Sequence, residues 1–415
     1  MTKPPSSSAT GSRQQWGAVL ALSLAAFVLV ASEFMPVSLL TPIAADLHIS
    51  EGRAGQAIAI SGAFALLTSL FISPVAGSRD RKVVLLWLTV LMILSGTVVA
   101  AAPNAVVFMI GRALIGVAVG GFWSMSAATA MRLVSDCHLP RALAIVNGGN
   151  ALASVLAAPL GSFLGAIIGW RWAFFCVVPV AAIAFVWKFI GMPPMKASRG
   201  ERPGSITGLL TQPSVALGMT ASALFFMGQF ALFTYLRPFL ETQTRVGPAM
   251  LSFLLLIIGV AGFIGTTLVG AFLAKGLFRT LAIIPAMMAV TAIALLFFGG
   301  SIAATAILLA IWGLVATAAP VGWWTWMART LPRDAEAGGG LMVAVIQLSI
   351  MLGATAGGIL FDMRGYRATF AVSSALLILA AIFAVLTARS GSGNRIARLN
   401  PVCDRTSGRC RRRPS

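Results

Sequence analysis

Apolar residues run through the chain in long stretches that short polar breaks separate. A helix needs about 20 mostly apolar residues to cross the hydrocarbon core of a bilayer. Stretches of that length predict twelve transmembrane helices, at residues 17–41, 54–77, 83–102, 106–131, 142–168, 172–191, 214–239, 249–273, 280–299, 302–327, 339–361 and 368–388. Pro, Gly or charged residues occupy the breaks and mark turns. The pattern therefore predicts an all-α membrane protein.

One break is longer than the others and divides the helices six and six. It covers residues 192–213 and is rich in Pro, Lys and Arg. We therefore expect an N-terminal tail at 1–16, a first six-helix bundle at 17–191, a cytoplasmic central loop at 192–213, a second bundle at 214–388 and a basic cytoplasmic tail at 389–415.

The two predicted bundles repeat one another. Gly169-Trp-Arg-Trp-Ala-Phe174 opens the sixth helix, and Gly365-Tyr-Arg-Ala-Thr-Phe370 opens the twelfth, 196 residues later. The same offset places Ala158 and Gly161 on Ala354 and Gly357. Two six-helix halves that are related by a parallel repeat form one of the architectures of secondary transporters.

The scarcity and the placement of charge narrow the function. Only 10% of the residues are charged, against about 25% in a soluble protein, which argues against a soluble enzyme. The net charge of +19 alone would favour nucleic acid, but 23 of the 30 basic residues fall in the tails and in loops on one side. The other seven are Arg53, Arg112, Arg171, Arg237, Arg245, Arg364 and Arg367. The positive-inside rule therefore predicts a multi-pass protein with both termini cytoplasmic and no nucleic-acid partner.

Two charged residues lie well inside predicted spans, away from their ends, and are candidates for proton coupling. Glu33 is in the first helix and Arg112 is in the fourth. A charge inside a membrane span is costly and is functional by default. At 1.5 Å per residue, Glu33 lies about 12 Å and Arg112 about 9 Å from the outer ends of their helices, so we expect a contact, direct or through water. A buried ion pair with a structural role is the alternative.

Two further motifs indicate moving parts. A tight charged loop between the second and third helices carries Gly77, Asp80 and Arg81; Asp80 can pair with Arg or with helix ends and hold one gating state. In the fifth helix, Pro159 frees a backbone carbonyl, while Gly161 and Gly165 permit close helix contact. A solvated loop and ordinary tight packing are the respective alternatives.

Polar side chains within the spans are candidates for the lining of a substrate cavity. Amides and hydroxyls among aromatic rings suit a neutral, polar, flat ligand, because rings stack and amides supply donors and acceptors. The candidates are Asn147, Asn150, Gln229, Tyr235, Trp324 and Gln347. Hydrogen bonds between helices and an interfacial aromatic belt are the alternatives.

The sequence contains no pattern that indicates a cofactor site, a metal site or an enzyme active site. The four Cys residues have no metal-ligand spacing, and the two His residues, His48 and His138, lie in predicted loops. A membrane-embedded enzyme or sensor would need a nucleophile–base pair, a metal cluster or a sizeable soluble domain. We therefore expect no cofactor, no metal and no enzyme activity.

The motifs together resemble the major facilitator superfamily across about residues 15–390. The Asp80-Arg81 loop is a shortened form of the family's helix 2–3 signature, and Arg112 with Gly116 and Gly120 resembles its helix 4 signature. The stretch Ala158-Pro-Leu-Gly161 resembles the antiporter signature, with Ala158 where Gly is usual. The resemblance implies a bacterial inner-membrane drug:proton antiporter that works by alternating access, with Glu33 carrying the proton and Arg112 tuning it.

Further segments are similar to the members of this family that export purine ribonucleosides such as inosine. These segments are Glu33–Pro42, Gly121–Ala127, Gly228–Pro238, Pro320–Trp323 and Ala344–Leu348. The resemblance implies a small nucleoside-like solute, protons and the lipid bilayer as partners of a monomer. Members that export sugars or chloramphenicol share much of this pattern, so efflux of sugars or amphipathic drugs is an alternative, as is uptake rather than efflux.

Overall fold

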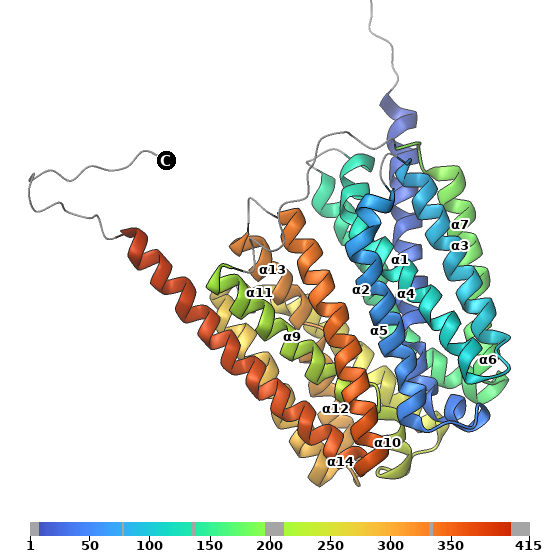
Figure 1. The fold of residues 1–415 in the computed structure, drawn as a ribbon, viewed down its shortest axis with the longest axis vertical. Coiled ribbons are helices and arrows are strands. Elements are labelled where there is room, and N and C mark those ends of the chain that lie inside the picture. Colours follow the sequence, from blue (N-terminus) through green and yellow to red (C-terminus); the bar gives the residue numbers. More distant parts are fainter. Residues whose placement is uncertain (1–7, 77–78, 135–137, 196–210, 332–334, 400–415) are drawn as a thin grey trace, which may run out of the picture.

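The computed structural model describes residues 8–76, 79–134, 138–195, 211–331 and 335–399 (Figure 1). Gly77 of the predicted gating loop lies outside the described residues, as do most of the central loop and part of both tails. Every regular element in the described residues is a helix. This confirms the all-α prediction.

The first half consists of α1 to α7. Their bounds are α1 Ser8–Asp46, α2 Glu51–Ala76, α3 Arg81–Ala100, α4 Ala105–Leu133, α5 Leu139–Ile168, α6 Trp170–Phe175 and α7 Val177–Gly191. The short α6 and α7 together form the sixth predicted span. The second half consists of α9 Pro213–Phe233, α10 Leu236–Thr242, α11 Pro248–Phe298, α12 Ile302–Ala316, α13 Ala319–Thr330 and α14 Ala335–Leu399.

Ten helical segments of the described residues are long and apolar enough to cross a membrane. Two of them are double: α11 changes direction at Gly276 and α14 at Gly365, where the backbone leaves helical geometry. Each of these two segments therefore holds two crossings, and the described chain makes the twelve crossings that the hydropathy pattern predicts.

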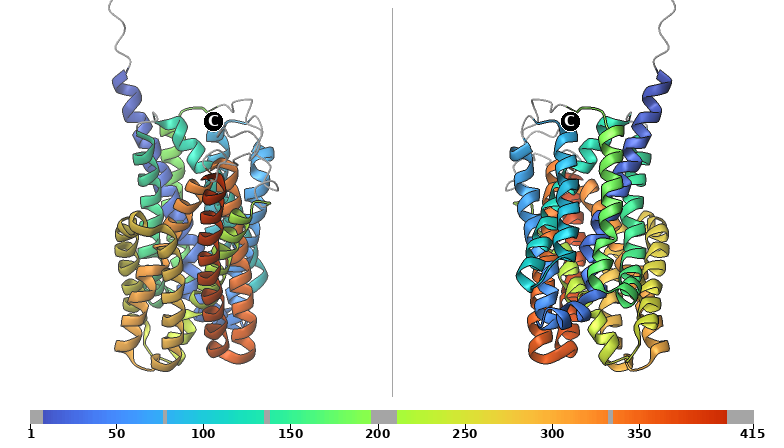
Figure 2. Two further views of the ribbon diagram at one scale, coloured as in Figure 1. Left: turned by 90° about the vertical axis from the view of Figure 1, so that its left-hand side faces the viewer. Right: turned by 90° about the vertical axis from the view of Figure 1, so that its right-hand side faces the viewer.

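Odd and even crossings alternate, which gives the molecule two ends. We call the end where α1 begins and α14 ends the tail end, and the opposite end the distal end (Figures 1 and 2). The distal turns lie at residues 47–50, 101–104, 169, 243–247, 299–301 and 365. Figure 1 shows the two halves meeting at the distal end and diverging toward the tail end.

Paired left-handed turns show the repeat in the backbone. Gly169 (φ 83°) and Gly365 (φ 71°) have positive φ and lie 196 residues apart. His48 (φ 52°) and Arg245 (φ 56°) have positive φ, lie 197 residues apart and join the first and second crossings of each half. L-residues seldom adopt this conformation, so two such pairs at matching places identify the halves as copies of one fold.

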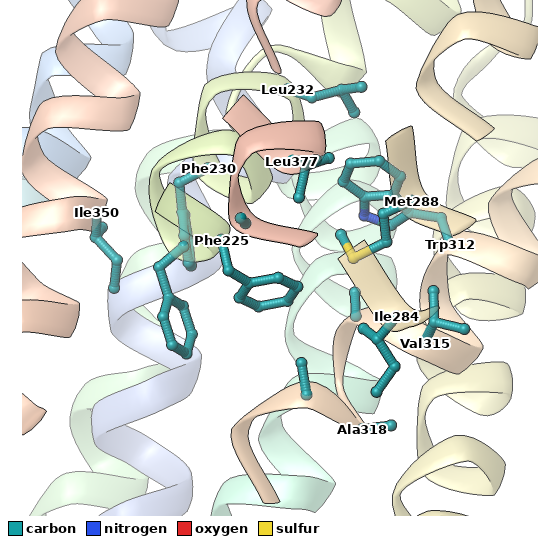
Figure 3. Close-up of a cluster of buried hydrophobic side chains, with 14 of the residues drawn as sticks. Phe225, Phe230, Leu232, Ile284, Met288, Trp312, Val315, Ala318, Ile350 and Leu377 are labelled. Atoms are coloured by element: carbon teal, nitrogen blue, oxygen red, sulfur yellow. The ribbon is translucent and has the colours of Figure 1, made fainter. Parts of the chain in front are cut away.

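Each half has its own apolar core. In the first half, buried side chains of α1, α2, α3, α4, α5 and α7 form one cluster, and a second cluster lies toward the distal end. In the second half, the cluster includes Phe225, Met288, Trp312 and Leu377 (Figure 3). This cluster also takes in Val37 of α1, so the two cores meet where the halves touch.

Two crossings of the second half are broken by proline. Because proline has no N–H, the carbonyl four residues earlier loses its helical partner. Pro238 removes the donor for Thr234, just after α9 ends at Phe233; Pro320 removes the donor for Ala316, where α12 ends. Discontinuous helices of this kind are typical of the substrate pathway in secondary transporters.

Candidate functional site

Arg112 hydrogen-bonds the backbone of α1 from inside the first half. The carbonyl of Ser32 lies four residues before Pro36, so it has no helical donor. Nη1 of Arg112 donates to this oxygen at 2.7 Å, and Nη2 donates to the carbonyl oxygen of Glu33 at 2.7 Å. Arg112 is fully buried and also donates to the carbonyl of Ala57 at 3.3 Å. The guanidinium therefore joins α4 to α1 and α2.

Arg237 does the same at the second proline of α1, but from the other half. Pro42 leaves the carbonyl of Ser38 without a helical donor. Nη1 of Arg237 in α10 donates to that oxygen. Its Nε donates to Glu241 Oε1 at 2.8 Å, which completes an ion pair on α10. This buried arginine therefore bridges the two halves near the distal end.

The carboxylate of Glu33 is buried, with 4% of the residue exposed. The charged and polar side chains that act on it are Arg112 and Gln347 of α14. No ion pair within 4.0 Å joins Arg112 to this carboxylate among the described residues, because the guanidinium is occupied by backbone carbonyls. The predicted contact between the two residues thus runs through the backbone of Glu33, and the two charges interact at longer range.

Gln347 adds an unused donor beside this acid. Its amide lies near the carboxylate, yet Nε2 has no partner in hydrogen-bond geometry in the described part of the chain. The residue is buried. Because a buried amide without a partner is costly, this donor is available to the carboxylate or to a ligand after a small movement.

A small cavity of about 100 Å³ lies where the two halves meet, between α1, α5, α9, α11 and α12. Phe34 of α1 and Phe230 of α9 line it and stack with their ring centres 5.5 Å apart. Gln229 lines the same cavity, and its Oε1 is a buried acceptor without a partner among the described residues. The cavity thus combines stacked rings with an unused amide acceptor.

The other predicted lining residues lie elsewhere. Asn147 and Asn150 lie on α5 toward the tail end from the cavity, the first exposed and the second half-buried. Trp324 of α13 is 37% exposed. It also lies toward the tail end, beyond the break between α12 and α13. Tyr235 is fully buried, away from the cavity lining.

Tyr235 belongs to a contact that closes the distal end. Its hydroxyl donates to the carbonyl of Ala354 at 2.9 Å and to that of Gly52 at 3.4 Å. In the same contact, Asp362 of α14 accepts hydrogen bonds from Ser50 and Gly52 at the start of α2. The distal end therefore closes through polar contacts between α2 of the first half and α14 of the second.

The second contact between the halves is apolar and depends on glycine. Pro159 in α5 leaves the carbonyl of Val155 without a donor, and Gly259 of α11 packs directly against the backbone of Val155. A side chain at position 259 would collide with that backbone. On α5, Gly161 packs against Ser38 of α1, and Gly165 packs against Leu39 of α1. The predicted helix-bending residues thus lie where α5 meets both α1 and α11.

The gating loop is anchored at the tail end. Oδ1 of Asp80 accepts hydrogen bonds from the backbone N–H groups of Lys82 at 2.8 Å and Met195 at 2.9 Å. The N–H of Arg81 donates to the carbonyl of Met195 at 3.0 Å. Asp80 therefore caps α3 and holds the segment that follows α7, which is a pairing with helix ends; its gating role stays a prediction.

Five residues of these contacts were not predicted from the sequence as site residues: Phe34, Phe230, Arg237, Asp362 and Lys188. Phe34 and Phe230 were detectable only as neighbours of Glu33 and Gln229. Lys188 was counted as a loop charge because it lies near the end of a span; it is buried in α7 and donates to the hydroxyl of Thr89 on α3. Asp362 lies one residue beyond the predicted span 339–361, so its position alone does not distinguish it.

Comparison with known proteins identifies the family. The model of the Major Facilitator Superfamily matches residues 22–339. The transcription regulatory protein OpdE of Pseudomonas aeruginosa is 61% identical over 379 residues, which cover 90% of this chain and 94% of that protein. The purine ribonucleoside efflux pump NepI of Salmonella paratyphi B is 38% identical over 370 residues, which cover 89% of this chain and 93% of the pump.

A solved structure has the same fold. The crystal structure of a bacterial homolog of the human lysosomal transporter Spinster matches with a TM-score of 0.73 at 15% identity, over 92% of this chain and 98% of that chain. This match shows the fold, and the family model over residues 22–339 together with the 38% identical relative shows the family. The chain therefore belongs to the major facilitator superfamily of membrane transporters.

Proposed function

We propose that this protein exports purine ribonucleosides such as inosine across the bacterial inner membrane in exchange for protons. It works by alternating access as a monomer, with the two six-helix bundles as the moving bodies. The tail end faces the cytoplasm, together with both termini, the central loop and the basic tail. The structure then represents the state that is closed toward the outside.

The observation that carries the nucleoside assignment is the Phe34–Phe230 pair beside the unpartnered acceptor of Gln229. A purine base is flat and stacks on aromatic rings. The base of inosine presents an N–H donor and a carbonyl acceptor on one edge, and the N–H donor complements the free Oε1 of Gln229. The 38% identical relative named as a purine ribonucleoside efflux pump supports the same substrate class.

The present cavity is too small to hold this substrate. Its volume of about 100 Å³ is below the ~300 Å³ at which ligand sites usually begin. A base enters only when Phe34 and Phe230 separate, which requires the two halves to move apart toward the tail end. The direct stacking of Phe34 on Phe230 therefore belongs to the arrangement in which no base lies between the two rings.

Glu33 carries the proton. Its carboxylate is buried between the halves, and Arg112 stabilises the charged form at a distance while Gln347 offers a hydrogen-bond donor from the second half. Separation of the halves removes Gln347 and admits water, which changes the balance between the charged and neutral forms. Proton uptake and release are thereby tied to the position of α14 relative to α1.

The test is uptake of labelled inosine into inverted membrane vesicles, with and without an imposed proton gradient. Gradient-dependent accumulation above that of vesicles lacking the protein is the expected result. No accumulation under either condition would remove the nucleoside assignment and leave a transporter of unassigned substrate. Competition by unlabelled sugars or chloramphenicol in the same vesicles tests the alternative substrates, efflux of sugars or amphipathic drugs.

A second candidate function is control of transcription, which the name of the 61% identical relative favours. An apolar chain of this kind can act on transcription by changing the cytoplasmic concentration of a small effector. Transcript levels in cells that carry the wild type or Glu33→Gln distinguish the two cases. If regulation follows from transport, the variant abolishes both; if regulation persists without transport, the protein signals through another route.

A further inference from the structure

We propose that Asp362 is a proton-sensitive positioning residue: its carboxylate holds the distal end closed, and its protonation from the distal side releases the two halves. The proposal deepens the antiport function given above and rests on it for the link to transport. It assigns the step by which an acidic outside favours opening toward the outside.

Asp362 completes the start of a helix in the other half. The first N–H groups of a helix have no partner within the helix and need an acceptor from elsewhere. At the start of α2, the hydroxyl of Ser50 accepts from the N–H of Arg53 at 3.2 Å. Oδ1 of Asp362 accepts from the N–H of Gly52 at 2.9 Å, and Oδ2 accepts from the Ser50 hydroxyl at 2.6 Å. One carboxylate therefore takes two of the donors at this helix end.

The approach is close because the residues that meet are small. Gly52 packs against Asp362 and Gly358, and Gly55 packs against the ring of Tyr235. A Cβ at either position would collide with these groups. The carboxylate thus reaches the α2 backbone only while α2 and α14 stay in contact, and it loses both bonds when the distal end opens.

The contact exists at only one of the two equivalent interfaces. The repeat offset of 196 residues relates Asp362 to Ala166 at the end of α5. The helix that meets α5, α11, begins at Pro248. The side chain of alanine cannot accept a hydrogen bond, and the backbone nitrogen of proline cannot donate one. The fold therefore does not require the cap, and Asp362 makes one interface sensitive to protonation.

Charged groups from several elements surround Asp362. Glu51 at the start of α2 interacts with the carboxylates of Asp362 and Glu241 and with the guanidinium of Arg237. Tyr235 also feels the charge of Asp362. Arg364 follows two residues later on the same helix and is exposed, as is Asp362 itself. When Asp362 is protonated, one of its oxygens carries a hydrogen and accepts hydrogen bonds less well. The side chain also loses the negative charge that interacts favourably with the positive N-terminal end of the α2 dipole.

The experiment measures the opening of the distal end directly, without substrate. Spin labels are placed at Ala101 and Gly300, which are exposed in distal turns of the first and second half. The background carries Ser in place of Cys137, Cys176, Cys403 and Cys410. Distances between the labels are recorded in the full chain in lipid nanodiscs between about pH 8 and pH 4, a range that extends to the ordinary titration range of Asp.

In the wild type, lowering the pH is expected to increase the open population relative to the closed one. Asp362→Asn keeps one acceptor oxygen but loses the charge and the second acceptor, so it is expected to favour the open form by about tenfold already at high pH, the size of one lost hydrogen bond, and to lose most of the pH response. Asp362→Glu keeps an ionisable group and is expected to retain the pH response. This variant tests the proposal if the Asn variant fails to fold.

The matched control is Asp46→Asn. Asp46 is a distal carboxylate that pairs with Arg171 inside the first half, so its removal leaves the contact between the halves intact. Wild-type populations and an unchanged pH response in Asp362→Asn would overturn the proposal, as would an equal shift in Asp46→Asn. If inosine transport fails in vesicles while these distances shift as expected, the substrate assignment falls and the role of Asp362 stands.

Discussion

Arg112 donates a 2.7 Å hydrogen bond to the carbonyl oxygen of Ser32, the group that Pro36 leaves without a helical donor. The cation of the first half therefore compensates for a missing backbone N–H in the helix that carries Glu33. The hydrogen bond to Ser32 fixes the position of the Arg112 guanidinium, and from that position its charge acts on the carboxylate of Glu33. Structural and electrostatic roles thus belong to one side chain, and they can be separated by mutation.

A double-mutant cycle of Arg112→Gln and Pro36→Ala separates them. Arg112→Gln alone leaves the Ser32 carbonyl buried without a donor, and we expect a loss of about 1–3 kcal/mol in the free energy of unfolding. Pro36→Ala supplies an N–H at the right position, so the same substitution is expected to cost less in that background. Unfolding of the purified proteins in detergent measures the coupling. Equal costs in both backgrounds would contradict this account.

Glu33→Gln tests the proton-carrying role. The neutral amide has nearly the same shape, so the variant is expected to insert and fold, to lose accumulation driven by a proton gradient, and to retain exchange of nucleoside down its own gradient. Efflux rates at several pH values measure this. Asp46→Asn, which removes a carboxylate paired within the first half, serves as the control. Wild-type rates from Glu33→Gln across the pH range would refute the coupling role.

Phe34→Ala and Phe230→Ala test the stacking site. Stacking on an aromatic side chain contributes about 1–3 kcal/mol per base, so we expect KM for inosine to rise by roughly tenfold in either variant. Phe34→Tyr keeps the ring and is expected to restore most of the affinity. Phe297→Ala, at a position that is 78% exposed, should leave KM unchanged. An unchanged KM in both cavity variants would exclude this stack as the base-binding site.

Gly259→Val tests the apolar contact between the halves. The new side chain would collide with the backbone of Val155, so the distal-closed arrangement is expected to be lost and transport to fall at least about tenfold. Gly270→Val on the same helix meets nothing within 4 Å and is the matched control. Vesicle transport together with chromatographic monodispersity measures both. Equal activity of the two variants would show that the close approach is dispensable.

Gly365→Ala tests the repeated left-handed turn. Gly365 (φ 71°, ψ −172°) and Gly169 (φ 83°, ψ 158°) lie in a region that is almost restricted to glycine, where alanine costs roughly 1–3 kcal/mol, and a corresponding loss of thermal stability in detergent is expected for Gly365→Ala and for Gly169→Ala. Gly247→Ala is the control, because that glycine has φ −78° and open space around it. Equal stability of all three variants would mean that the turns carry no strain.

Much of the fold follows from the sequence alone. The twelve crossings and the two halves are visible as apolar stretches, and the Gly-aromatic-Arg motif marks the repeat that the paired turns at Gly169 and Gly365 confirm. The helix ends differ from the prediction by a few residues, because a polar first turn such as that of α2 remains helical beyond the apolar stretch. The breaks at Pro238 and Pro320 were not predicted, because residues 214–239 and 302–327 each form one apolar stretch, although each proline removes a helical hydrogen bond.

The site was less predictable because its contacts join distant segments. Glu33 and Arg112 stand out as charges in apolar helices, and the offset from Pro36 identifies Ser32 as the orphan carbonyl. Nothing local identifies the donor, or tells that Arg237 performs the same role at Ser38 from the other half. The meeting of Phe34 with Phe230 likewise depends on how two bundles dock, a relation that hydropathy does not encode.

The glycines at the interface have a consequence for speed. Where Gly52, Gly55 and Gly259 meet the other half, backbone lies against backbone, against the ring of Tyr235 or against the carboxylate of Asp362. Ordering a long side chain costs up to about 2 kcal/mol of conformational entropy, and these glycine contacts avoid that cost each time they re-form. We therefore expect turnover to depend weakly on closing of the halves and strongly on breaking the few polar bonds at their distal end.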